Sequence, residues 1–295
     1  MDKRLKLGYS GADFSKYRYK PMLHINFPSS ILLIFICGLG SSCHGQSANI
    51  IPLKQAHAHN DYLQSNPLTD ALDAGFCSVE SDIFLSDGEL LVGHYRWTLK
   101  KSRTLKKLYL EPLMKQVERN NGRVYRDGPL FTLLIDIKEN GTGVYPELKK
   151  QLLEFESMLC GLRNGQYEYR AIQVVISGSC PRKLIEADTQ RLVAIDGRLS
   201  DLDSKAPANL IPMISARWGS TFKWRGRSEI DDAELAKLKS IVHSSHQMQR
   251  RVRLWASPES TAVWQQLLDV GIDHINTDNL KKLQSFLLLK HQPEK

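Results

Sequence analysis

Two acidic residues stand inside one short apolar run of the sequence, and their spacing suggests metal chemistry. Glu80 and Asp82 are two residues apart within the run Ser78–Phe84. Because side chains alternate across a strand, both carboxylates would face the same side of a sheet. Burying two such charges together is costly unless a cation neutralises them, and oxygen ligands suit Mg²⁺ or Ca²⁺ better than zinc. The pair therefore predicts a site for one divalent cation.

A second apolar run repeats this pattern. Asp136 lies near the end of the run Phe131–Ile137, and Lys138 follows the run directly, so these two charged residues are again two apart. Asp136 is the natural third ligand for the cation, and Lys138 could place a positive charge on a nonbridging phosphate oxygen. An exposed edge strand or a structural ion pair would explain one such doublet. Its repetition favours the metal site.

Histidines follow two of the apolar runs and suit proton transfer near neutral pH. His57 closes the run Leu53–His57, and His94 follows Leu90–Val92. One imidazole could take a proton from an attacking hydroxyl while the other protonates the departing oxygen of a phosphodiester. We predict His57 and His94 as the catalytic pair, with His59 orienting it, binding phosphate or replacing His57. A structural role is expected for the remaining histidines, which are His44, His243, His246, His274 and His291.

The elements that would position these residues follow a repeated pattern of strand and helix. Short β-branched or apolar runs alternate with stretches of helical period, which is typical of βα units around a parallel sheet. Eight runs are predicted as strands: Leu53–His57, Ser78–Phe84, Phe131–Ile137, Gln173–Ser177, Leu192–Ile195, Leu210–Ser215, Val252–Ala256 and His274–Asn276. Helices are expected at Glu147–Leu159, Asp231–Ser244, Ser260–Val270 and Leu280–Leu289. Eight strands predict a single-domain α/β protein, a (β/α)8 TIM barrel over residues 46–295, with its active site at the carboxyl ends of the strands.

Residues 1–45 have the layout of a signal peptide. A basic stretch precedes the nine-residue apolar run Ile31–Leu39, which is too short to span a bilayer, and small residues follow it. Cleavage is expected before Gln46, although translation could start at Met22 and Cys43 could instead carry a lipid. We therefore expect an extracytoplasmic protein, periplasmic or secreted, with lipid anchoring as the alternative.

Charge and cysteine usage exclude some classes of protein. The formal net charge is +8, but residues 1–45 hold six basic and two acidic residues and so account for half of it. The signs are well mixed elsewhere, so no nucleic-acid partner is expected. Only Cys77, Cys160 and Cys180 follow the leader, an odd number that suggests core packing and leaves a bridge between Cys160 and Cys180 open.

The motifs around these residues resemble those of the phosphatidylinositol phospholipase C-like phosphodiesterase superfamily, which includes glycerophosphodiester phosphodiesterases and spider-venom sphingomyelinases D. The closest resemblance is to a bacterial and fungal branch that opens with His-x-His-Asn-Asp-Tyr. Here the opening is His57–Tyr62, and it is followed by Val79–Ile83 and Leu91–His94. The resemblance continues through Thr104–Leu113, Asp136–Lys138, Arg253–Ala256 and Ile275–Asp278, so it covers nearly all of residues 46–295.

This resemblance implies a TIM barrel that hydrolyses a phosphodiester with one divalent cation, Mg²⁺ or Ca²⁺. It implies metal ligands at Glu80, Asp82 and Asp136, catalytic histidines at His57 and His94, and an aromatic wall at Trp255. The substrate would be a small phosphodiester or a phospholipid headgroup, a role in lipid metabolism that could involve peripheral contact with a membrane. We assign substrate binding to His59, Asn60, Lys138 and Trp255, with Asp61, Arg217 and Asp278 as further candidates.

Two departures from the superfamily limit the choice of substrate. Glycerophosphodiesterases usually open with His-Arg-Gly, whereas Ala58 and His59 stand at those places here, so the phosphate-holding arginine is missing. Their third metal ligand is commonly Glu, whereas Asp136 is closer to the sphingomyelinase D pattern. The alcohol groups of the substrate therefore cannot be transferred by analogy.

Two other functions fit parts of the sequence. His57-x-His59 also resembles the opening of zinc amidohydrolases, with Asp278 as their late carboxylate, but no histidine closes the middle strands of the barrel. A barrel that only binds a sugar or a headgroup is the second alternative, with stacking area on the loop that contains Trp218, Phe222 and Trp224. Arg217 in that loop could bind phosphate or be a solvated charge.

Overall fold

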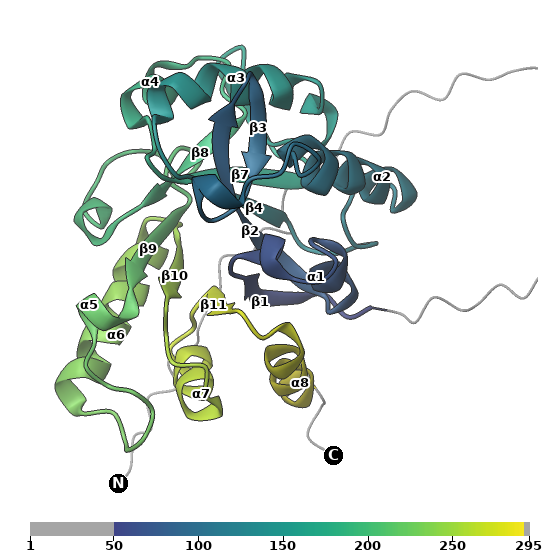
Figure 1. Ribbon diagram of the computed structural model, residues 1–295. Helices are drawn as coiled ribbons and strands as arrows, with labels where there is room; N and C mark the ends of the chain where they lie inside the picture. The colour runs from purple at the N-terminus through teal and green to yellow at the C-terminus, as the bar shows by residue number, and fades with distance from the viewer. Residues whose placement is uncertain (1–49, 292–295) are drawn as a thin grey trace, which may run out of the picture. The chain divides into compact units, whose positions relative to one another are not determined.

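The eight sequence runs predicted as strands form one closed parallel barrel in a computed structural model that describes residues 50–291 (Figure 1). The predicted leader, Met22 and Cys43 lie outside the described residues. The barrel strands are β1 (Leu53–Ala58), β2 (Phe76–Ser86), β4 (Phe131–Ile137), β7 (Ile172–Gly178), β8 (Val193–Gly197), β9 (Met213–Arg217), β10 (Arg251–Trp255) and β11 (His274–Thr277). Their order is β1-β11-β10-β9-β8-β7-β4-β2, and parallel pairing of β1 with β2 closes the barrel. The predicted (β/α)8 fold is confirmed.

Strand β2 continues beyond the barrel and forms a hairpin with β3 (Glu89–Val92). Its last residues, Ile83 to Ser86, pair antiparallel with β3. The chain then returns to the barrel mouth, where the backbone N–H of Gly93 donates to the carbonyl of Asp82 at 3.2 Å. This return is what places His94 beside β2. A second antiparallel hairpin, β5 (Gly161–Arg163) and β6 (Gln166–Glu168), lies between β4 and β7 in the chain.

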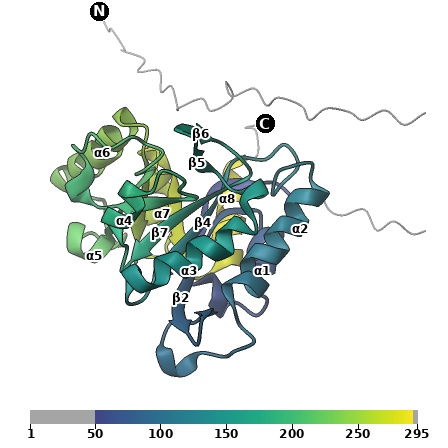
Figure 2. The same cartoon turned by 90° about the horizontal axis from the view of Figure 1, so that it is seen from above.

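Helices lie around the outside of the strands (Figure 2). They are α1 (Thr69–Asp73), α2 (Glu111–Arg119), α3 (Gly141–Leu153), α4 (Arg182–Ala187), α5 (Trp218–Thr221), α6 (Asp232–Gln247), α7 (Thr261–Asp269) and α8 (Leu280–His291). The side chains of Asp231 and Ser260 accept hydrogen bonds from backbone N–H groups in the first turns of α6 and α7, so these two helices begin where their capping residues predict. Helix α3 begins six residues earlier than predicted, because the Asn140 side chain caps it by accepting a hydrogen bond from the N–H of Gly143. The helix ends at Leu153. No helix among residues 50–291 is long and apolar enough to cross a membrane.

The apolar layer between strands and helices also takes in residues that were expected at the surface. Trp218 and Phe222 are buried, their rings 4.6 Å apart, and the indole N–H of Trp218 donates to the carbonyl of Trp224 at 2.8 Å. Two of the three aromatic residues predicted for stacking are therefore part of the core, and Trp224 is half-buried, a correction that weakens the support for a purely binding barrel. Cys77 and Cys160 are buried free thiols, as core packing predicts, and Cys180 is also free.

Candidate metal centre and active site

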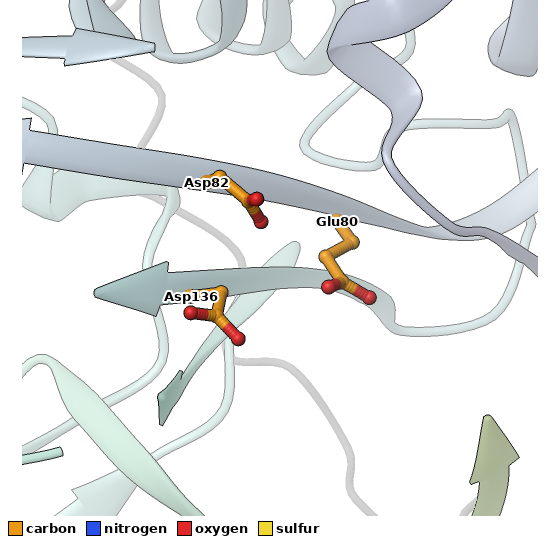
Figure 3. Close-up of side chains that lie close together, drawn as sticks. All are labelled: Glu80, Asp82 and Asp136. Atoms are coloured by element: carbon orange, nitrogen blue, oxygen red, sulfur yellow. The ribbon is translucent and has the colours of Figure 1, made fainter. Parts of the chain in front are cut away.

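Three carboxylates meet at the mouth of the barrel, as the spacing of Glu80, Asp82 and Asp136 predicts. Strands β2 and β4 are parallel neighbours, and their register sets Asp82 beside Asp136. Figure 3 shows the three side chains converging from the two strands. One oxygen of each lies within 4.8 Å of the others. Among residues 50–291, these three carboxylates are the group of Asp, Glu, His or Cys side chains that is close enough together to hold a metal ion. The group contains no histidine, and this disfavours the zinc amidohydrolase alternative.

The hydrogen bonds of these carboxylates leave some of their oxygens open. Asp82 Oδ2 accepts from Tyr62 Oη at 2.7 Å and lies 2.9 Å from His94 Nδ1 and 3.1 Å from Lys138 Nζ. Asp82 Oδ1 is buried and has no hydrogen-bond partner among the described residues. An unsatisfied buried carboxylate oxygen is costly, and a cation would satisfy it. The residues present therefore fit a divalent cation held by oxygen ligands.

Glu80 is anchored in a similar way, by a residue that we did not predict. Its Oε2 accepts from the Arg253 guanidinium at 2.5 Å and lies 3.3 Å from His57 Nε2. Arg253 also donates through Nε to Asn276 Oδ1 at 3.0 Å and is buried. Arg253 and Trp255 are two residues apart on β10, so the strand alternation that identified Glu80 and Asp82 could have indicated Arg253 as well.

Asp136 and Lys138 complete the acidic cluster. Burial is the main cause that raises the pKa of Asp136 to about 6, and the charges of Asp82 and Glu80 add to it while Lys138 opposes it. Burial lowers the pKa of Lys138, but the charges of Asp136 and Asp82 outweigh it and keep the ammonium form. A Cβ at Gly178, which has a φ of 66°, would lie 2.3 Å from Asp136 Oδ1, so glycine at this position leaves room beside the carboxylate.

His59 is half-buried and held by a carboxylate. Its Nδ1 lies 2.7 Å from Asp278 Oδ1 and 3.1 Å from Asn60 Nδ2. Burial alone would lower the pKa of His59, but the hydrogen bond to Asp278 and the charges of Glu80 and Asp278 outweigh it and raise the pKa. Nε2 has no hydrogen-bond partner within residues 50–291 and is the nitrogen left for proton transfer.

His94 is held in a similar way by a carboxylate of the cluster. Its Nδ1 lies 2.9 Å from Asp82 Oδ2 and 3.0 Å from the Tyr62 hydroxyl, and its side chain is 38% exposed. The Tyr62 hydroxyl also lies 2.8 Å from Asn60 Oδ1. A single phenol therefore touches Asp82, His94 and the amide that contacts His59. We did not predict a role for Tyr62, although it closes the His-x-His-Asn-Asp-Tyr motif.

The position of His57 differs from the prediction. Its side chain is fully buried, with Nδ1 2.7 Å from Ser78 Oγ and Nε2 3.3 Å from Glu80 Oε2. Burial, followed by the charge of Arg253, lowers the pKa of His57 well below the ordinary value. A neutral ring whose two nitrogens are both engaged does not reach a substrate at the barrel mouth. His59, two residues later and 21% exposed, has the geometry that we expected of His57.

The remaining predicted residues fall into two groups. Trp255 is half-buried at the end of β10, and the exposed Arg217 lies over its ring, 5.8 Å from the centroid. Both stand at the barrel rim, apart from the hydrogen-bonded cluster of carboxylates. Asp61 is fully buried and accepts from the Leu68 backbone N–H and the Tyr109 hydroxyl, so it secures the loop after β1. It is removed from the candidate substrate-binding residues.

A polar group that we did not predict borders Asp136 on the adjacent strands β7 and β8. Ser177 Oγ donates to Asp196 Oδ2 at 2.9 Å, and Arg198 forms an ion pair with the same oxygen at 2.7 Å. Because Ser177 stands in register with Asp136, this group continues the polar surface around the barrel mouth.

Fold and site together define a (β/α)8-barrel protein with an acidic cluster and two carboxylate-bound histidines at the carboxyl ends of its strands. The chain belongs to the AIM6-like phosphodiesterase domain family, whose model matches residues 45–196, more than half of its length. The matched span includes the partly exposed His59 and His94 and all three carboxylates of the cluster.

The chain is also similar to fungal proteins. The chain is 26% identical to Altered inheritance of mitochondria protein 6 of Eremothecium gossypii over 85% of this chain and 74% of that protein. It is also 26% identical to the homologue of that protein in Arthroderma benhamiae, over 80% of this chain and 84% of the relative. Among solved structures, a glycerophosphodiester phosphodiesterase from Parabacteroides distasonis is 14% identical, with a TM-score of 0.48 over 81% of this chain and 98% of that one. The fold assignment rests on the strand pairing of the chain itself.

Proposed function

We propose that this protein is a metal-dependent phosphodiesterase that uses His59 and His94 as its general acid and base. The observation that carries the proposal is the matched setting of the two rings. Each is partly exposed, and in each Nδ1 is held by a carboxylate at 2.7 or 2.9 Å. Such a bond fixes the tautomer and leaves Nε2 to exchange protons. The three-carboxylate cluster, in which Asp82 contacts His94, supports the assignment.

The chain's own residues supply binding, orientation and proton transfer in this proposal. Glu80, Asp82 and Asp136 would hold Mg²⁺ or Ca²⁺, and a bound cation would stabilise the charge that develops on the phosphate oxygens. One histidine takes the proton of the attacking hydroxyl at Nε2, and the other gives a proton from Nε2 to the departing oxygen. Lys138, whose side chain is 25% exposed, would contact a nonbridging oxygen.

The substrate class follows from the site and its surroundings. A groove of about 590 Å³ adjoins the candidate site and is lined by Asn60, Tyr62 and His94 together with residues of the following loop. This volume suits a ligand the size of a headgroup or a short alcohol. We therefore propose a small phosphodiester or a phospholipid headgroup as substrate. Trp255 and Arg217 would contact the part of the substrate that lies toward the opposite rim.

Export by the predicted leader belongs to the same proposal. The support is the signal-peptide layout of residues 1–45, and sequencing the N-terminus of the protein recovered outside the cell would test it. A start at Gln46 is expected. A protein that retains residues 1–45 inside the cell would contradict export.

The test of the function is hydrolysis of a substrate panel that contains glycerophosphodiesters, lysophospholipids, phosphomonoesters and cyclic amides. We expect turnover of phosphodiesters alone. His94→Ala should lower that turnover about a hundredfold or more, whereas His243→Ala, an exposed histidine on α6, should leave it unchanged. Turnover of the amides, or equal activity of both variants, would contradict the proposal.

A further inference from the structure

The segment from Tyr95 to Lys107, which follows His94, has an unusual composition. It holds six basic residues and no acidic one, the basic residues being Arg96, Lys100, Lys101, Arg103, Lys106 and Lys107. The rest of the described chain mixes its charges. Such a block of like charge repels itself and is typical of a surface that meets an anionic partner.

Large hydrophobic side chains project from the same segment and from the loop after β1. Trp97 is 81% exposed and Tyr95 48%, and their rings stack 4.6 Å apart at an interplanar angle of 6°. Leu63 is 67% exposed. Exposed tryptophan is rare on a soluble surface, and stacking holds these two rings out in solvent instead of against the core. The two features together indicate a partner with both an apolar phase and a negative charge.

These side chains surround the approach to the candidate active site. Leu63, Tyr95, Lys100 and Arg103 line the same groove as His94. The Arg103 guanidinium donates to the backbone carbonyl of Tyr62, which ties the basic segment to the loop that carries the site. We name the exposed parts of Leu63, Tyr95, Trp97, Lys100 and Lys101 the rim surface.

The charges of the basic segment are only partly compensated. Arg96 pairs with Glu139, Lys101 lies 3.5 Å from Asp87, and Lys106 lies 2.5 Å from Glu154. Lys100 forms no ion pair with any residue in 50–291, and neither does Lys107. Exposed pairs such as that of Lys101 contribute little energy and exchange readily for other anions.

We propose that the rim surface docks the protein on an anionic lipid bilayer. Tryptophan and tyrosine favour the boundary between headgroups and acyl chains, and lysines above them attract the negative surface of the bilayer. A nucleic acid offers negative charge and bases that can stack on Trp97, but it has no acyl-chain region into which Leu63 could insert. If the chain is a phosphodiesterase, as proposed above, this docking brings a lipid phosphodiester directly to the groove beside His94.

The test is cosedimentation of the full chain with vesicles of phosphatidylcholine alone or mixed with phosphatidylglycerol. We expect binding to the mixed vesicles that weakens with added salt. Trp97→Ala should lower the affinity about tenfold, and Lys100→Glu at least about fivefold. The matched controls are Leu289→Ala on α8, whose side chain is 69% exposed, and Lys239→Glu on α6, and both should bind like the unaltered protein.

Several outcomes would overturn docking: no binding to mixed vesicles, equal losses in the controls, or binding to an RNA homopolymer but not to vesicles. Trp97→Ala should leave hydrolysis of a soluble phosphodiester unchanged, and its thermal unfolding should match that of the unaltered protein. Because vesicle binding is measured without turnover, the two proposals fail separately. A protein that hydrolyses soluble phosphodiesters but ignores vesicles refutes docking alone, and one that binds vesicles without hydrolysis refutes the phosphodiesterase alone.

Discussion

The inside of this barrel has two polar layers that use similar residue types in opposite ways. At the mouth, His59 and His94 are partly exposed, and carboxylates hold one nitrogen of each. One layer deeper, His57 and His274 are buried with their rings 6.0 Å apart. Beside them Arg251 donates to Thr132 Oγ1 and Gln173 Oε1, both at 2.6 Å, and both neutral acceptors.

The difference shows that the depth of a histidine in the barrel, more than its residue type, decides whether its ring is placed to contact a substrate or only to support the fold. Burial is the main cause that lowers the pKa of both His57 and His274, so the deep rings stay neutral and act as packing and hydrogen-bonding groups. At the mouth a carboxylate contacts Nδ1 of each ring, and both side chains are partly exposed. The following substitutions separate the two layers, in order of expected effect.

The largest effect is expected at the acidic cluster. Glu80→Gln keeps the shape of the side chain but removes the charge that would hold the cation. Phosphodiester hydrolysis should fall about a thousandfold or more, because several kcal/mol of charge stabilisation are lost. Kinetics and thermal unfolding of the same preparation would check this. A folded Glu80→Gln protein with normal turnover would remove the metal centre from the account.

The two histidines of the His57-x-His59 motif should respond differently. His59→Ala should lower kcat by about a hundredfold to ten-thousandfold with little change in the free energy of unfolding. His57→Ala should instead destabilise the fold by about 1–3 kcal/mol, because it leaves Ser78 without its buried partner. Urea unfolding and single-turnover kinetics on both variants make the comparison. The reverse pattern would restore His57 as the catalytic residue.

Tyr62 should matter through the groups that it positions. Tyr62→Phe removes the hydroxyl that contacts Asp82, His94 and Asn60 and should lower kcat about 10- to 100-fold, with a smaller change in KM. Tyr125→Phe is the matched control, because the Tyr125 hydroxyl donates to the backbone carbonyl of Phe76 at 2.8 Å and contacts no side chain of the candidate site. A loss of stability without a loss of kcat in Tyr62→Phe would show that the hydroxyl is only structural.

The deep layer predicts a pH effect on stability. His274 is neutral in the folded state because burial and the charges of Arg251 and Arg253 disfavour its protonation. The unfolded chain takes up a proton below about pH 6.5, so the free energy of unfolding should fall as the pH drops below that value. His274→Gln should reduce this slope by up to about 1.4 kcal/mol per pH unit. Urea unfolding between pH 5 and pH 8 measures it, and identical slopes would mean that His274 is protonated when folded.

The strands and the acidic cluster could be predicted from the sequence because they depend on local patterns. Alternation within β2 and β4 put Glu80, Asp82 and Asp136 on the inner face, and parallel neighbours then brought them to one level. The choice between His57 and His59 depends on how β1 is staggered against β2, which pairs His57 with Ser78 and not with Glu80. This stagger between two strands cannot be predicted from the residue pattern within either strand.

Contacts between distant segments were also beyond sequence reasoning. Arg253 reaches Glu80 across the barrel, 173 residues away in the chain. Trp218 and Phe222 follow a strand end and suggest a loop, but the short helix α5 turns both rings into the core. Both contacts are tertiary, and at Trp218 and Phe222 the tertiary contact overrides what the local sequence favours.

The most direct test of the central claim is phosphodiester turnover after EDTA treatment, followed by addition of single metal ions. The account predicts no turnover in EDTA and recovery with Mg²⁺ or Ca²⁺ but not with Zn²⁺, since the cluster offers oxygen ligands alone. Asp136→Asn should need a much higher concentration of the cation for the same recovery. Full turnover by the metal-free protein would contradict the account.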